Sequence, residues 1–165
     1  MRRVAERGPP HHDSGAGTLG TGHRRVYPHR EMPVRVLIVD DQEPFRAVAR
    51  TVVELTDGFE VVGEAENGED SVASAHQLRP DLVLMDVNLP GISGLEATRQ
   101  ILADHVDDKP VVVLVLSTYE AAEYGPQAEE VGAASFIPKS EFSPERLVDA
   151  WAAATAESPS ESASA

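Results

Sequence analysis

Short apolar runs alternate with helical patterns through the middle of the chain, and this alternation limits the available folds more than any other feature. The segments between the runs repeat apolar residues at helical spacing and mostly end at Gly or Pro. Each run is brief and almost wholly apolar, as expected of strands buried on both faces. The runs are Val34–Val39, Phe59–Ala65, Leu82–Met85, Pro110–Leu116 and Ala134–Ile137. This order predicts an α/β protein with a five-stranded parallel sheet and helices on both faces.

The expected strand order is 2-1-3-4-5, the usual doubly wound arrangement at this size, which makes the fold flavodoxin-like. We assign this domain to residues 34–154. Residues 1–33 carry six Arg against three acidic residues and have no apolar periodicity, so we predict a disordered basic N-terminal arm. The change in composition at Met32 also leaves open a translation start there. Residues 155–165 are rich in Ser and Ala and predict a flexible tail.

The charge balance and the apolar pattern exclude several classes of function. The 165 residues include 28 acidic and 14 basic side chains, and the net charge of −14 argues against general nucleic-acid binding. The absence of Cys excludes disulfide scaffolds, thiolate catalysis and Cys-ligated metals. No apolar run approaches the roughly 20 residues that cross a bilayer, so we expect a cytoplasmic protein without membrane contact.

Two helices have distinctive local signals. Ser143 followed by Pro144 is typical of a helix N-terminus, with Ser as the cap. Gly125-Pro126 falls inside the fourth helical segment, and Pro costs about 3 kcal/mol in a helix interior. We therefore predict that residues 120–124 form a turn and that Pro126 restarts the helix.

The carboxyl ends of the predicted strands carry the candidate site. Asp40 and Asp41 follow the first strand and Asp86 follows the third. These two strands are neighbours in this fold, so three carboxylates meet where such folds bind ligands. Like charges that close either raise the pKa values of the carboxyl groups or require a cation, and Mg²⁺ suits carboxylate, water and phosphate oxygens. No Gly-rich loop follows the first strand, which argues against a bound flavin or nucleotide.

A hydroxyl and an ammonium, from Ser117 and Lys139, follow the fourth and fifth strands and suit the oxygens of an incoming phosphoryl group. Asp86 stands alone at the end of the central strand and is the candidate nucleophile, whereas the adjacent Asp40 and Asp41 are better placed to hold metal. Each residue taken singly is also typical of a turn, a cap or a solvated surface. Their joint placement at one edge favours a functional site.

The segments around these residues resemble the receiver domain of bacterial two-component response regulators over residues 34–154. The matching segments are VRVLIVDDQEPFR, DLVLMDVNLPGISGLE, VVVLVLST and GAASFIPKS. The resemblance implies that Asp86 accepts a phosphoryl group from the phosphohistidine of a histidine kinase or a histidine phosphotransfer protein. It also implies a Mg²⁺ site formed by Asp40, Asp41, Asp86 and the backbone carbonyl of Asn88.

The resemblance further implies that Ser117 and Lys139 bind the phosphate, and that Ser117 and Phe136 form a switch that moves on activation. Phe136 is equally typical of an ordinary core aromatic. The family usually has Pro directly after the lysine, whereas this chain has Ser140 there.

No DNA-binding helix-turn-helix pattern follows residue 154, so we expect a stand-alone receiver that signals through contacts with an unknown protein target and is not an enzyme. One alternative is the receiver portion of a DNA-binding response regulator that lacks its output domain. Another is a Mg²⁺-dependent aspartyl phosphatase, although such enzymes typically carry an acid two positions after the nucleophile, where this chain has Asn88.

Overall fold

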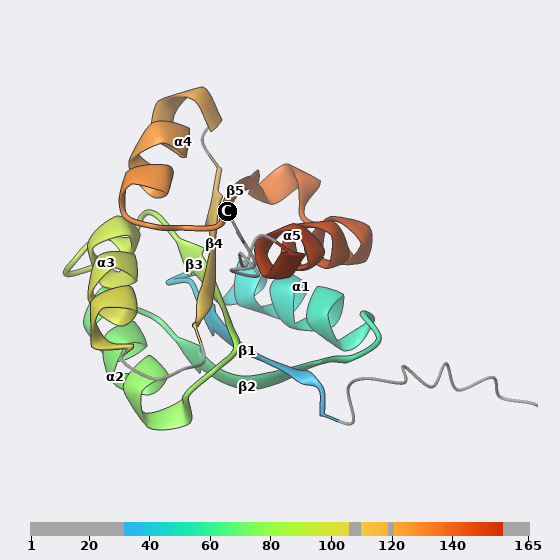
Figure 1. The fold of residues 1–165 in the computed structure, drawn as a ribbon. Coiled ribbons are helices and arrows are strands. Elements are labelled where there is room, and N and C mark those ends of the chain that lie inside the picture. The colour runs from blue at the N-terminus through green and yellow to red at the C-terminus, as the bar shows by residue number, and fades with distance from the viewer. Residues whose placement is uncertain (1–31, 106–109, 119–120, 157–165) are drawn as a thin grey trace, which may run out of the picture. The chain divides into compact units, whose positions relative to one another are not determined.

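The computed structural model describes residues 32–105, 110–118 and 121–156, in which strands and helices alternate along the chain (Figure 1). The strands are β1 (Val34–Val39), β2 (Phe59–Ala65), β3 (Leu82–Asp86), β4 (Val112–Ser117) and β5 (Ser135–Pro138). The helices are α1 (Glu43–Glu54), α2 (Gly68–Leu78), α3 (Gly94–Asp104), α4 (Ala121–Glu130), a short 3-10 helix η1 (Lys139–Glu141) and α5 (Pro144–Ala156).

The sheet is wholly parallel, in the order β2-β1-β3-β4-β5. This confirms the predicted flavodoxin-like, doubly wound fold. β1 lies between β2 and β3, and Val39 of β1 pairs with Met85 of β3. The next residue along each strand, Asp40 and Asp86, therefore reaches the same edge of the sheet at the same level.

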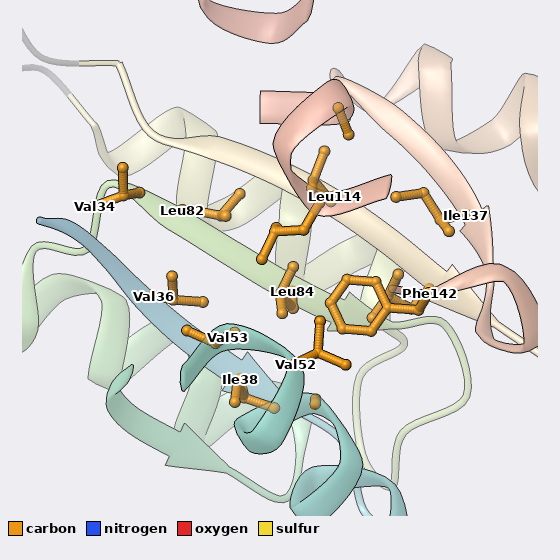
Figure 2. Close-up of a cluster of buried hydrophobic side chains, with 14 residues drawn as sticks. Val34, Val36, Ile38, Val52, Val53, Leu82, Leu84, Leu114, Ile137 and Phe142 are labelled. Carbon is orange, nitrogen blue, oxygen red and sulfur yellow. The ribbon is translucent and has the colours of Figure 1, made fainter. Parts of the chain in front are cut away.

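Side chains of β1 alternate between two buried clusters, one on each face of the sheet. Val36 and Ile38 belong to the cluster under α1 and α5, called here the α1–α5 core (Figure 2). Leu37 and Val39 belong to the cluster under α2, α3 and α4, the α2–α4 core. Burial on both faces explains the continuous apolar runs, and each buried Val or Leu contributes about 1.5–3 kcal/mol.

Side-chain caps fix where α2, α3 and α5 begin. The Ser143 hydroxyl accepts the N–H of Arg146 at 3.1 Å, and Pro144 is the first helical residue, which confirms the predicted start of α5. Asn67 caps α2 in the same way, because its Oδ1 accepts the N–H of Asp70 at 2.7 Å. A cap of this kind contributes about 1 kcal/mol.

The prediction of a broken fourth helix is wrong. α4 runs continuously through Pro126, and of the predicted turn at residues 120–124 only Glu120 lies outside the described residues. Pro126 is exposed and removes a single main-chain hydrogen bond, to the carbonyl four residues earlier. Tyr124 and Ala128, which flank it on the helix, pack against the α2–α4 core. Their burial offsets the cost of the missing bond.

The described elements begin and end close to the predicted domain limits. β1 begins at Val34, whereas α5 continues through Ala156, past the predicted limit at Ala154. The Thr155 hydroxyl donates to the Trp151 carbonyl at 2.8 Å within that last turn. Most of the predicted arm and tail lies outside the described residues. None of the described helices combines the length and apolar content needed to cross a membrane.

Candidate functional site

Three carboxylates converge at the carboxyl edge of β1 and β3. One oxygen each from Asp40, Asp41 and Asp86 lies within 4.8 Å of the other two. Asp40 and Asp86 are buried, with 1% and 5% of their surface exposed, while Asp41 is exposed. The structure therefore brings together the three acidic residues that the sequence pattern singled out.

Asp40 is held in place by contacts to both its carboxylate and its backbone carbonyl. Its Oδ1 accepts the N–H of Gln42 at 2.8 Å, and its backbone carbonyl accepts Nη1 of Arg46 at 2.8 Å. Its Oδ2 lies 2.6 Å from Nζ of Lys139 as an ion pair. Oδ2 is thus a buried oxygen whose partner in the described part of the chain is the Lys139 ammonium.

Lys139 brings the only described cation among the residues predicted for the site. It is the first residue of η1, directly after β5, and 11% of its side chain is exposed. Nζ lies 3.6 Å from Oδ1 of Asp86 in addition to its contact with Asp40. The ammonium thus connects the metal-candidate carboxylate with the nucleophile candidate.

Burial raises the pKa of Asp86 to about 6, and the charge of Asp40 adds to this effect. Lys139 and the Asn88 N–H, which approaches Oδ1 of Asp86 at 3.4 Å, act in the opposite direction. A carboxyl group at this position is therefore ionised only at the expense of folding stability, unless a cation compensates it.

We expect Asp86→Asn to stabilise the metal-free protein at neutral pH. The folded chain holds the Asp86 proton up to about pH 6, whereas the unfolded chain releases it near pH 3.8. Protonated Asp86 therefore contributes its full share to the stability of the wild type below the unfolded-state pKa. This contribution is lost as pH rises through the folded-state pKa. As pH rises from about 4 to about 7.5, the free energy of unfolding of Asp86→Asn, measured with urea, should increase relative to that of the wild type by roughly 1 to 2 kcal/mol. Identical pH profiles for both proteins would contradict this.

The remaining predicted residues occupy different positions relative to the carboxylates. Ser117 is fully buried at the end of β4, one residue beyond the pair that Leu116 forms with Asp86. Asn88 is exposed in the loop between β3 and α3. Phe136 is partly buried on β5 and packs against the α2–α4 core.

The β3–α3 loop is attached to the start of α2 by a residue that sequence reasoning missed. The Glu69 carboxylate accepts the N–H of Ile92 at 3.0 Å, and the Gly68 N–H approaches the Pro90 carbonyl at 3.5 Å. Gly91 has a φ of 79°, which favours Gly at this turn. Nothing in the sequence indicated that Glu69 would be the partner of this loop.

Arg46 is a second residue that was missed. It is 6% exposed, and besides the Asp40 carbonyl its guanidinium contacts Glu66 at 3.0 Å and Glu43. The available signal was the spacing of Arg46, which lies three residues before Ala49 and therefore on the apolar stripe of α1. Phe45, whose ring lies next to Lys139, carried no such signal, because its spacing is that of an ordinary core residue.

Comparison with known proteins gives consistent matches. A family model described as the response regulator receiver domain matches residues 36–152. Response regulator GacA of Pseudomonas viridiflava is 43% identical over 106 residues, which are 64% of this chain and 48% of GacA. Transcriptional regulatory protein DegU of Brevibacillus brevis is 33% identical over 120 residues, 73% of this chain and 49% of DegU.

A solved structure agrees with these sequence matches. The response regulator domain of Thermotoga maritima CheB has a TM-score of 0.66 and 30% identity, over 74% of this chain and 97% of that one. The chain spans about half the length of the GacA and DegU relatives.

Proposed function

This chain belongs to the response regulator receiver domain family, a family of signalling modules, and from that membership we propose that Asp86 accepts a phosphoryl group from a phosphohistidine. The donor is a histidine kinase or a histidine phosphotransfer protein. The observation that carries the proposal is the position of Asp86, buried at the end of β3 between two further carboxylates and the Lys139 ammonium. That set combines a nucleophile with groups that can balance phosphate charge.

In the proposed reaction a carboxylate oxygen of Asp86 attacks phosphorus in line with the donor nitrogen. A P–O bond forms as the P–N bond to the imidazole breaks, and the electron pair of that bond stays on nitrogen. Lys139, which lies 3.6 Å from Asp86 before transfer, pairs with a phosphoryl oxygen after it. Charge-assisted contacts of this kind are among the stronger hydrogen bonds in proteins.

The residues present fit a magnesium ion. Receiver domains bind Mg²⁺ at an acidic cluster, and here the cluster is Asp40, Asp41 and Asp86. Each of the three carboxylates brings one oxygen to within 4.8 Å of the others, and such a set of oxygen ligands suits a hard divalent cation. We propose that the backbone carbonyl of Asn88 completes the protein ligands. A bound ion supplies positive charge that offsets the carboxylates and the phosphoryl oxygens.

We propose that phosphorylation shifts a two-state equilibrium of the domain. Ser117 would move its hydroxyl toward the new phosphate, and Phe136 would repack against the α2–α4 core in response. Phe136 is only partly buried there, so an alternative packing does not require opening the sheet. The output is a contact with a protein target, in keeping with the net charge of −14.

Incubation with Mg²⁺ and acetyl phosphate tests the proposal directly. The expected product carries one phosphoryl group that is stable in acid and released by hydroxylamine, and borohydride reduction should map it to Asp86. Failure to incorporate phosphate, or incorporation at another residue, would overturn the proposal. Turnover of a phosphate ester that depends on Asp86 would instead support the aspartyl phosphatase alternative.

Asp41→Asn is expected to weaken Mg²⁺ binding by about tenfold or more, because it removes one anionic ligand. Asp41 is exposed, so the variant should fold normally. Chemical-shift titration of amides around the site measures the affinity, and Asp104→Asn, at the exposed end of α3, is the matched control. Equal affinities in wild type and Asp41→Asn would remove Asp41 from the ligand set.

A second candidate function is the receiver portion of a transcriptional regulator. It is favoured by the match to DegU, of which this chain spans about half. In that case the phosphorylated domain would act on an attached output domain rather than on a separate target. Sequencing the transcript beyond the codon for Ala165 discriminates between the two, since only the regulator requires a continued reading frame.

A further inference from the structure

The ring of Phe45 lies against the lysine of the site. Nζ of Lys139 is 4.3 Å from the centroid of the Phe45 ring and sits over its face. Phe45 is in the first turn of α1, and its side chain is partly buried against the α1–α5 core. The two residues come from opposite ends of the domain sequence, and the fold brings them together at the acidic edge.

Three contacts define where the ammonium lies. Two are carboxylate oxygens, from Asp40 at 2.6 Å and Asp86 at 3.6 Å, and the third is the face of the Phe45 ring. The electron-rich face attracts a cation, and the attraction is larger where water is excluded, as around this side chain with 11% exposure. The ring has no lone pair that would compete with a phosphoryl oxygen for the N–H donors of Lys139.

We propose that Phe45 is a positioning residue for phosphoryl transfer, which acts by holding the Lys139 ammonium beside Asp86. This inference rests on the proposed function of Asp86. The carboxylate contacts of Lys139 must change when a phosphoryl group arrives, whereas the ring contact can persist. Phe45 thereby keeps the ammonium at the acceptor while its hydrogen-bond partners are exchanged.

The main alternative is that Phe45 only fills the α1–α5 core, and substitutions can separate the two roles. Phe45→Leu keeps an apolar side chain but removes the aromatic face, while Phe45→Tyr keeps both. Phe59→Leu is the matched control, because Phe59 packs against the same core with its ring edge-on to Trp151. Urea unfolding of all variants measures the structural contribution.

The kinetic test compares rates of phosphorylation by acetyl phosphate at saturating Mg²⁺. Phe45→Leu should be slower than wild type by about fivefold to tenfold, with Phe45→Tyr restoring most of the rate and Phe59→Leu retaining it. Site-specific replacement of Phe45 by mono-, di- and trifluorophenylalanine should lower the rate stepwise, because each fluorine weakens the ring face without changing its packing. If Phe45→Leu fails to fold, the rates of the fluorinated series alone test the positioning role.

A second readout needs neither metal nor phosphate. In the metal-free protein, the ε-methylene protons of Lys139 should show an upfield ring-current shift that persists in Phe45→Tyr and disappears in Phe45→Leu. If the wild type shows this shift but is never phosphorylated, the proposed role of Asp86 is wrong, whereas the contact between Lys139 and Phe45 stands. Equal rates across the fluorinated series, or unchanged Lys139 resonances in Phe45→Leu, would overturn the positioning role of Phe45 and leave Asp86 unaffected.

Discussion

Asp86→Asn is expected to abolish incorporation of the hydroxylamine-labile phosphoryl group. The amide has the shape of the carboxylate but no charged oxygen to form the bond to phosphorus, so the rate should fall below detection while the fold is kept. Because burial raises the pKa of Asp86 to about 6, the same variant should also be more stable than wild type at neutral pH. Loss of labelling together with gained stability distinguishes a missing acceptor from an unfolded protein.

Asp104→Asn supplies the control for that experiment. It makes the same chemical change at the exposed end of α3, so its labelling should equal that of the wild type. Intact-mass measurement after acetyl phosphate treatment, with and without hydroxylamine, reads out all three proteins. A phosphoryl group that persists on the Asp86→Asn chain would place the acceptor elsewhere.

Gly94→Ala is expected to lower the free energy of unfolding by about 3 kcal/mol. A Cβ built at Gly94 would overlap the carbonyl oxygen of Asp86, a backbone atom with little room to move. The Gly94 N–H also donates to the Val87 carbonyl at 2.9 Å, which fixes the start of α3 close to the end of β3. Relief of the overlap therefore requires either that α3 moves away or that the acceptor strand shifts.

Gly125→Ala is the matched control for the glycine substitution. Apart from its chain neighbours and the backbone of α4 itself, no atom lies within 4 Å of a Cβ built at Gly125. Alanine there should change the free energy of unfolding by no more than about 1 kcal/mol, because its better helix propensity is opposed by contact of the new Cβ with the ring of Pro126. Urea unfolding should thus show a large loss of stability for Gly94→Ala alone. A neutral Gly94→Ala would show that the α3 start is more adaptable than the structure indicates.

The fold could be predicted because the residues that determine it act locally and consistently. The runs that form β1 and β3 are buried on both faces, and no other element type accommodates them in so few residues. The positions of Asp40 and Asp86 followed from strand order alone, since parallel neighbours end at the same edge. The positions of these carboxylates were therefore as predictable as the topology.

The features that were missed depend on contacts between distant segments. Pro126 was expected to break α4 because its local cost was visible, whereas the packing of Tyr124 and Ala128 that offsets it was not. Glu69 and Phe45 make their contacts with Ile92 and Lys139 only when α2 and α1 approach the loops at the edge of the sheet. Residue type and spacing carry little information about such approaches.

The sheet that separates the two cores also fixes the carboxylate edge independently of the exposed helix surfaces. Asp86 and Ser117 end central strands whose positions are set by main-chain pairing and by burial on both faces. Val48 of α1 and Val148 of α5, by contrast, are exposed on the helices. Substitutions at such exposed positions should therefore leave the geometry around Asp86 unchanged, so the helix surfaces can be altered independently of the carboxylate edge.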